Sequence, residues 1–536
     1  MSSRVARSAG LIGIATLGSR VLGVAREVVL AALFGAGTAM DAFNVAFRVP
    51  NLLRDLFAEG AMTAAFVPTF TRTLTAKGRE AAWRLGSLVI NALLLVTGTL
   101  VVLGIVFAGP ITQAIASGDE FAAVPGKLEL TTLLTRIMLP FLTTIAVAVA
   151  MMGMLNSLNR FFVPALSPAM FNVATIFCAF AVVPFMPAVG LPPIAGIALA
   201  TLLGGLGQIA LQWPLLRREG FRYRPILDFS DPELREILRL MGPGTLGVAA
   251  VQINVFVNTM LATGEPEGAV SWLSYAFRLM YLPIGLFGVS IATASLPEIS
   301  RHAAIADRAA MRRTISSGLR LMLMLNVPAT IGLIALAHPI VSFLLERGRF
   351  TAADTAATAA ALVFYAPGLL GYSAVKIASP SFYSLGDSRT PVMISVLSVA
   401  TNLVLNLTLV QVLGYRGLAL GTALAAILNA GTLLVLLSRR LDGLEAEPVA
   451  IAFLKILAAS TAMGIAAWLT ASWLSPVLPP ARVVWMSVDV WTGTRLAAAI
   501  AAGVLALVGA ARLLRIEEFD EAAARVLRRL GRRSSA

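Results

Sequence analysis

The chain has 536 residues, of which 58% are hydrophobic and only 13% are charged, and its mean hydropathy is +0.84. Soluble globular proteins carry about twice that share of charge, so the composition excludes an ordinary soluble domain and predicts an all-α polytopic membrane protein. We interpret the formal net charge of +14 as cationic loops at a membrane surface and not as a nucleic-acid site.

The first apolar stretch begins after Arg4 and Arg7, as a secretory signal peptide does. However, Arg20 and Arg26 interrupt it, and no cleavage site of small residues separates it from the next segment. We therefore expect a retained spanning helix, in which Arg20 and Glu27 share a face while Arg26 points about 120° away.

A window of roughly twenty residues finds about fourteen hydrophobic spans, and their length excludes a transmembrane β-barrel. The predicted limits are 10–34, 41–70, 86–108, 130–153, 162–184, 193–214, 240–262, 270–296, 316–344, 354–378, 391–413, 417–437, 450–474 and 494–513.

Polar residues of the second span recur at gaps of three and four, which places them on one helix face. They are Asp41, Asn44, Arg48, Asn51, Asp55 and Glu59, with Arg54 at the edge of the same stripe. An arginine at the centre of a spanning helix costs about 2.5–3.5 kcal/mol, so charges there usually face a cavity. The stripe predicts a polar track roughly 27 Å long, on a helix kinked at Pro50. The alternative is a set of buried salt bridges or snorkelling side chains.

Basic residues cluster in alternate loops between the predicted spans, for example at 72–84, 217–224 and 301–313. The loops between these clusters are acidic, with Asp119, Glu120, Glu265 and Glu267. Because cytoplasmic loops are enriched in Lys and Arg, both termini are expected in the cytoplasm.

Three short patterns recur at an offset of about 230 residues. Ala46-Phe47-Arg48-Val49 returns as Ala276-Phe277-Arg278-Leu279, and Ser157-Leu158 returns as Ser384-Leu385. Phe66-Val67-Pro68 returns as Ser295-Leu296-Pro297. The repeat predicts two pseudo-symmetric six-helix lobes, 1–225 and 226–445, with two extra helices in 446–514 outside it. Basic and apolar residues at helical spacing in 515–536 predict a basic amphipathic tail on the cytoplasmic surface, and a solvated basic tail is the alternative. Only Arg48 keeps its charge in the second copy of the stripe, as Arg278.

Other polar residues of the spans are less specific. Lys376 is either a cavity cation or an interfacial residue, whereas Gln252, Asn172, Asn402 and Asn406 are expected as interhelical hydrogen-bond partners. The single cysteine, Cys178, is interpreted as a packing residue. We expect no metal site, no phosphate-binding glycine loop and no catalytic triad, so the chain is not expected to be an enzyme.

The motifs Ser19-Arg20-Val21-Leu22-Gly23, Asp41-Ala42-Phe43 and Pro50-Asn51-Leu52-Leu53-Arg54 with Phe57-Ala58-Glu59-Gly60 resemble the MurJ (MviN) family. These are lipid II flippases of the multidrug/oligosaccharidyl-lipid/polysaccharide exporter superfamily. The resemblance extends through Asn159-Arg160-Phe161, Ser271-Trp272 and Phe382-Tyr383-Ser384 and so covers nearly the whole chain.

This resemblance implies a central cavity in which Arg20, Arg26 and Arg54 face a lipid-linked pyrophosphate, with Arg278 opposite. It also implies that Asp41 lies near the outer gate, that Glu59 is an acidic cavity residue, and that the two extra helices in 446–514 form a groove for the lipid tail. We add Arg48 to the substrate-binding set and Asn51 and Lys376 to the cavity set. One departure is the pair Phe277 and Tyr281 beside Arg278, where acidic residues are common in the family.

The implied function is transfer of lipid II from the inner to the outer leaflet of the bacterial cytoplasmic membrane by alternating access. A flippase for another polyprenyl-pyrophosphate glycan, a drug or ion antiporter and a membrane scaffold are the alternatives. The expected partners are lipid II, membrane lipid and the cell-wall synthesis machinery, with no nucleic acid, and the transporter is expected to be a monomer. No cofactor is expected, and a coupling ion or the membrane potential would supply the energy.

Overall fold

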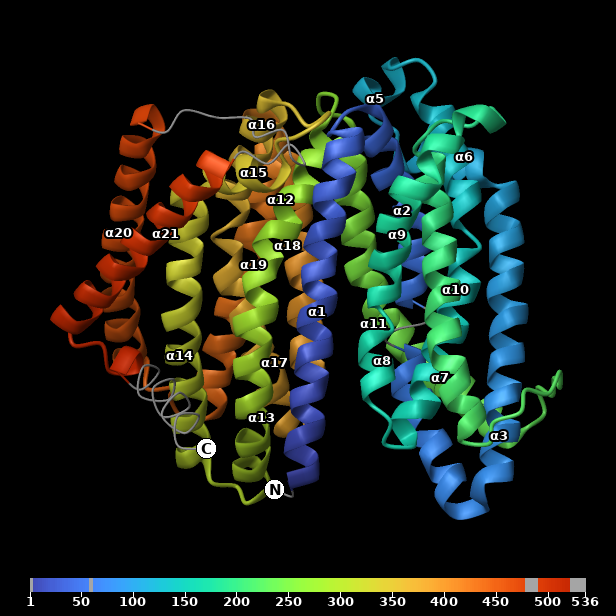
Figure 1. The fold of residues 1–536 in the computed structure, drawn as a ribbon. Helices are drawn as coiled ribbons and strands as arrows, with labels where there is room; N and C mark the ends of the chain where they lie inside the picture. The colour runs from blue at the N-terminus through green and yellow to red at the C-terminus, as the bar shows by residue number, and fades with distance from the viewer. Residues whose placement is uncertain (1–2, 57–60, 478–489, 521–536) are drawn as a thin grey trace. The chain divides into compact units, whose positions relative to one another are not determined.

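The computed structural model describes residues 3–56, 61–477 and 490–520, which form helices joined by turns and short loops (Figure 1). The predicted all-α membrane class is confirmed. Among the described residues, nine helices are long and apolar enough to cross a membrane, or ten if Ala352–Tyr365 and Gly368–Ser384, bent by 43°, are one span. Glu59 and the tail from residue 521 onward lie outside the described residues.

The helices fall into two compact units, and unit 1 comprises residues 1–271 together with 348–350. Its helices are α1 (Ser3–Phe34), α2 (Thr38–Arg54), α3 (Ala61–Val106), α4 (Ala108–Ile115), α5 (Asp119–Ala123), α6 (Lys127–Met138), α7 (Phe141–Ser157), α8 (Phe162–Leu166), α9 (Ala169–Ala181), α10 (Ala195–Arg218) and α11 (Pro232–Thr263). Helix α3 is two helices joined at Gly78, whose φ of 82° turns the chain. Helices α3, α7 and α10 pack side by side (Figure 1).

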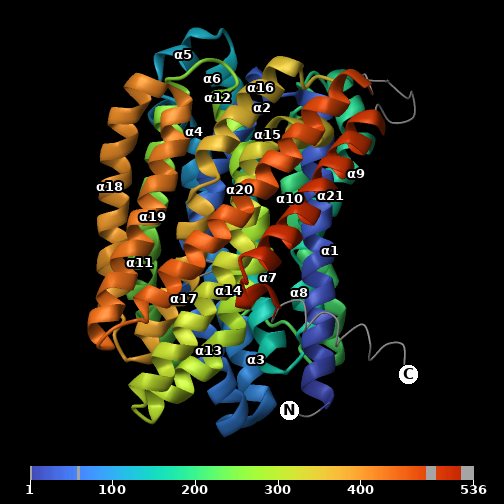
Figure 2. The same cartoon turned by 90° about the vertical axis from the view of Figure 1, so that its left-hand side faces the viewer.

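Unit 2 comprises residues 272–347 and 351–536. Its helices are α12 (Ala269–Pro283, begun in unit 1), the π-helix η4 (Ile284–Gly288), α13 (Val289–Ala304), α14 (Arg308–Ala335), α15 (Ala337–Leu345), α16 (Ala352–Tyr365), α17 (Gly368–Ser384), α18 (Arg389–Leu413), α19 (Tyr415–Arg440), α20 (Ala446–Val477) and α21 (Val490–Leu513). Helix α18 packs on α19, and α20 packs on α14 and α21 (Figure 2). After α21, Glu518 pairs with Arg320 of α14 at 3.4 Å.

The helix order of the first half recurs in the second half at offsets near 230 residues, in agreement with the sequence repeat. Helix α1 corresponds to α11, α2 to α12, α4 to α15 and α7 to α17. The backbone also changes at equivalent places, because a π turn follows α2 at residues 55–56 and another follows α12 at residues 284–288. Such π turns often lie at functional sites. Pro50 lies inside α2, and the helix continues to Arg54.

Small residues allow the helices of each unit to approach closely. A Cβ on Gly205 would lie 2.1 Å from the Thr144 hydroxyl, and one on Gly371 would lie 2.4 Å from the backbone of Ala426. Close backbone contact of this kind replaces the hydrophobic driving force that lipid cannot provide.

Candidate functional site

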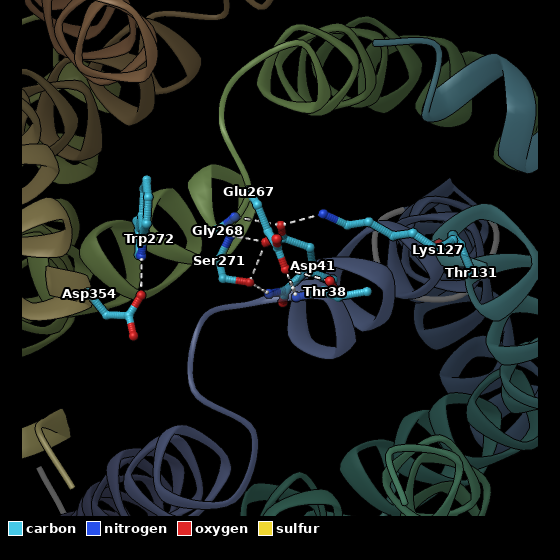
Figure 3. A network of polar contacts seen from close by, with 10 residues as sticks. Thr38, Asp41, Lys127, Thr131, Glu267, Gly268, Ser271, Trp272 and Asp354 are labelled. Carbon is cyan, nitrogen blue, oxygen red and sulfur yellow. Dashed lines mark hydrogen bonds and ion pairs between the residues drawn. The ribbon is translucent and has the colours of Figure 1, made fainter. Parts of the chain in front are cut away.

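The first turn of α2 carries a buried carboxylate, Asp41, which is 1% exposed. It accepts hydrogen bonds from the Lys127 ammonium at 3.0 Å, the Gly268 N–H at 2.8 Å, and the Ser271 N–H and hydroxyl at 3.0 and 2.7 Å. Figure 3 shows these donors converging on Asp41 from α6 and from the start of α12. The carboxylate therefore joins three segments that are far apart in sequence.

Lys127 completes this buried ion pair, and its side chain is 1% exposed. Its ammonium also lies 4.3 Å from the centre of the Phe121 ring. Lys127 is not one of the predicted site residues, since it lies just before the predicted span 130–153. The sequence repeat offers a signal, since the residue 227 positions later is another first-turn charge, Asp354 of α16. A buried pair of this kind is strongly sensitive to the loss of one partner.

A second contact joins the start of α2 to the loop before α12. The carboxylate of Glu267 accepts a hydrogen bond from the Thr38 N–H at 2.7 Å and another from the Thr38 hydroxyl (Figure 3). The hydroxyl bond is the main reason that the pKa of Glu267 is lower than its ordinary value of 4.5. Asn44, one turn after Asp41, donates to the Ser271 hydroxyl at 3.3 Å.

Two of the predicted phosphate-binding arginines are each held by the acidic residue that follows them in the chain. Arg54 donates from Nε at 3.1 Å and from Nη2 at 2.8 Å to one oxygen of Asp55. Arg26 donates from Nε at 3.0 Å, and also from Nη2, to one oxygen of Glu27, and its guanidinium lies 5.2 Å from the centre of the Phe171 ring. The salt-bridge alternative therefore describes these two arginines as they stand in the structure.

Asp55 also connects α2 to α11. Its second oxygen accepts from the Gln252 amide at 2.8 Å and from Asn51 at 3.5 Å. Gln252 is thus an interhelical hydrogen-bond partner, as predicted. Arg54 and Asp55 remain partly accessible, since their side chains are 25% and 21% exposed.

A cavity of about 340 Å³ lies inside unit 1 beside this cluster. Its polar lining residues are Arg48, Asn51 and Gln252, and its walls are otherwise apolar, with Leu103 and Phe107 among them. The structure therefore brings Arg48 and Asn51 of the predicted site together at one cavity.

Three further predicted site residues are not among those that line this cavity. Arg20 is half-buried on α1, Arg278 is half-buried on α12 in unit 2, and Lys376 is exposed on α17 in unit 2. Phe277, beside Arg278, packs in an aromatic cluster with Tyr281, Tyr365 and Tyr372. Within the part of the chain that the structure describes, no group of three His, Cys, Asp or Glu residues is placed to hold a metal ion.

Known proteins resemble this chain over most of its length. The model of the family described as lipid II flippase MurJ matches residues 30–488. A protein of Burkholderia cenocepacia named lipid II flippase MurJ is 35% identical over 433 residues, which cover 80% of this chain and 82% of that protein. A protein of Vibrio cholerae named probable lipid II flippase MurJ is 36% identical over 434 residues, covering 80% and 82% respectively.

Solved structures give the same result. A lipid II flippase MurJ in an inward closed conformation superposes with a TM-score of 0.75 at 28% identity, covering 94% of this chain and 99% of that one. An inward-facing multidrug resistance transporter of the MATE family superposes with a TM-score of 0.67 at 17% identity, covering 81% and 99%, and so shares the fold. The chain belongs to the MurJ family of lipid II flippases.

Proposed function

We propose that this protein carries lipid II from the inner to the outer leaflet of the bacterial cytoplasmic membrane. The observation that carries the proposal is the family match over residues 30–488, together with relatives above 30% identity over four-fifths of the chain. The protein is a transporter rather than a catalyst, and it spans the membrane several times. We propose further that both termini lie in the cytoplasm, as the loop charges indicate.

The head group would bind at the arginines of α1 and α2. A guanidinium can hold two oxygens of a phosphate at once, and it stays protonated in a dry site. In the structure, the Nε and Nη2 of Arg26 and of Arg54 each donate to one carboxylate oxygen of the next residue. We assign the pyrophosphate to Arg26 and Arg54, with Arg20, Arg48 and Arg278 as further contacts and Asn51, Lys376 and Glu59 as cavity residues.

Movement would follow alternating access, in which the cavity opens to one side of the membrane at a time. We propose that the Asp41 contacts belong to the outer gate, because opening there would break the bonds that join α2, α6 and the start of α12. The polyprenyl tail would follow the groove of α20 and α21 and remain in lipid. The membrane potential, worth about 2.3 kcal/mol per charge per 100 mV, would help to return a cationic cavity after release.

Depletion in cells tests this proposal. Loss of the protein is expected to accumulate lipid II on the inner leaflet, to leave little of it accessible at the outer leaflet, and to cause lysis. Accumulation of another polyprenyl-linked glycan instead would contradict the lipid II assignment.

Complementation with single variants then tests the arginines. Arg26→Ala and Arg54→Ala, expressed at normal levels, are expected not to restore growth. Arg84→Ala is the matched control, because Arg84 pairs at 3.2 Å with Asp231, outside the predicted site. Full growth with Arg54→Ala would refute the pyrophosphate site.

A further inference from the structure

The carboxylate of Asp55 has no part in the transport scheme above, yet both its oxygens are engaged. One oxygen accepts two hydrogen bonds from Arg54, and the other accepts from Gln252 and Asn51. It stands at the π turn that ends α2, where its own N–H bonds back to the carbonyls of Asn51 and Leu52. The turn therefore fixes the carboxylate between the guanidinium of α2 and the amide of α11.

The Arg54 guanidinium is a site for an anion, and the Asp55 carboxylate occupies it in the structure. The Arg54 Nε and Nη2 both donate to one oxygen of Asp55, at 3.1 and 2.8 Å, so Asp55 occupies the two N–H groups that could otherwise hold two oxygens of a phosphate. An anionic substrate at Arg54 would have to replace Asp55 or share the guanidinium with it. Because the two side chains are 25% and 21% exposed, a ligand can reach them.

The other predicted phosphate-binding arginine shows the same arrangement. Arg26 donates from its Nε and Nη2 to Glu27, the next residue, and these two side chains are 18% and 12% exposed. Ion pairs near the loops of unit 1 are more open, as between Arg84 and Asp228, which are 52% and 45% exposed and 3.6 Å apart. Partly buried pairs of adjacent residues thus occur at both arginines assigned to the pyrophosphate.

We propose that Asp55 is a resident counter-anion, which orients the Arg54 guanidinium while the site is empty and is displaced when a pyrophosphate oxygen arrives. This inference rests on the proposed function. Asp55 is a positioning residue and weakens ligand binding, because the ligand must replace an existing charge-assisted bond. The same competition allows release, since Asp55 returns to Arg54 as the ligand leaves. Displacement also breaks the bond to Gln252, so that occupancy of the site is transmitted to α11.

Binding of inorganic pyrophosphate to the purified full-length protein tests this role. Asp55→Asn removes the negative charge at nearly constant volume and is expected to bind pyrophosphate about tenfold more tightly. Asp55→Glu keeps the charge and is expected to bind like the wild type. Asp228→Asn is the matched control, because it removes the carboxylate of an open ion pair elsewhere in unit 1, and is expected to leave affinity unchanged.

Transport of lipid II in liposomes supplies the second readout. Asp55→Asn is expected to lower the maximal rate while it lowers the half-saturating concentration, since release becomes slow. A purely structural role predicts weaker binding and a lower melting temperature for Asp55→Asn, and this result would overturn the inference. Unchanged affinity in a variant that keeps the wild-type melting temperature would overturn it as well.

Arg54→Ala separates this inference from the proposed function. If Arg54→Ala binds pyrophosphate as well as the wild type does, the assignment of the pyrophosphate site fails. If Arg54→Ala loses binding but Asp55→Asn gains none, only the counter-anion role fails. If Arg54→Ala loses binding and Asp55→Asn gains it, both are supported.

Discussion

In each sequence repeat an equivalent pair of helices is joined at the first turns, α2 with α6 and α12 with α16, but the residues that make the contact differ. In the first repeat, Asp41 at the start of α2 pairs with Lys127 at the start of α6, and both are almost completely buried. In the second repeat, the indole N–H of Trp272 at the start of α12 donates to Asp354 at the start of α16 at 2.9 Å (Figure 3). The acidic residue is on the first helix of the pair in the first repeat, α2, and on the second helix in the second repeat, α16. Its partner is a lysine in the first repeat and a neutral tryptophan in the second. The repeat therefore determines where the helices are joined but leaves the residue types open.

The connectors before α6 and α16 differ in a second way. Gly118, in the connector after α4, packs against the end of α11, where an added Cβ would lie 2.2 Å from the backbone of Thr263 and Gly264. Gly348, in the connector after α15, packs against α1, where a Cβ would lie 2.1 Å from the Ala32 carbonyl oxygen. Because α1 and α11 are repeat counterparts, each connector contacts the first helix of the other repeat. Gly348 has a φ of +59°, whereas Gly118 has an ordinary φ of −72°.

Removing the buried cation of the first repeat is expected to have the largest effect. Lys127→Met leaves Asp41 buried without its ammonium partner, which costs about 3–5 kcal/mol in the free energy of unfolding. Denaturant titration of the purified protein in mixed micelles measures this loss. Asp41→Asn combined with Lys127→Met is expected to recover most of it, because neither side chain then carries a buried charge.

The equivalent change in the second repeat is the matched control. Trp272→Phe keeps the ring but removes one hydrogen bond to a carboxylate, at a cost of about 1.5–3 kcal/mol. Equal losses for Lys127→Met and Trp272→Phe would contradict the difference that we draw between the two joints.

The glycine contacts are expected to give a graded series, below the loss expected for Lys127→Met. Gly348→Ala combines a backbone clash with a left-handed conformation and is expected to cost about 2–4 kcal/mol. Gly118→Ala introduces only the clash and should cost about 1–3 kcal/mol. Gly190→Ala introduces only the conformational strain, since its φ is +73° and nothing lies within 4 Å of the added Cβ, and should cost about 1–2 kcal/mol. If Gly348→Ala were no worse than Gly190→Ala, the close approach of Gly348 to Ala32 would add nothing to the cost of an alanine there.

Sequence periodicity predicted the faces of these helices better than the contacts made there. The stripe of α2 was predicted as one polar track, and in the structure it serves several purposes. Asp41 and Asn44 are buried in the network with Ser271, whereas Arg48 and Asn51 line the cavity. A pattern of threes and fours places side chains on a face, but it does not show which partners another helix brings to that face.

The pairing of the arginines could not be predicted for a related reason. Adjacent residues on a regular helix do not face each other, so periodicity separates Arg54 from Asp55 and Arg26 from Glu27. Long guanidinium side chains nevertheless reach the neighbouring carboxylate, and Asp55 begins the π turn that follows α2. The fold class, by contrast, follows directly from hydrophobic length, which local side-chain geometry does not change.

The acidic contact at the start of α2 is expected to give the smallest effect, visible only in its pH dependence. Hydrogen bonds from Thr38 hold the pKa of Glu267 below 4.5, so the folded protein binds this proton less readily than the unfolded chain does. The stabilisation is therefore complete above that ordinary value and is lost as the pH falls through the lower pKa of the folded state. Thr38→Val removes the hydroxyl donor and is expected to flatten the stability profile as the pH falls below 4.5, whereas Thr38→Ser keeps the donor. Identical profiles for Thr38→Val and Thr38→Ser would show that the hydroxyl of Thr38 does not set the pKa of Glu267. The start of α2 would then differ from that of α12 only in the contact between Asp41 and Lys127.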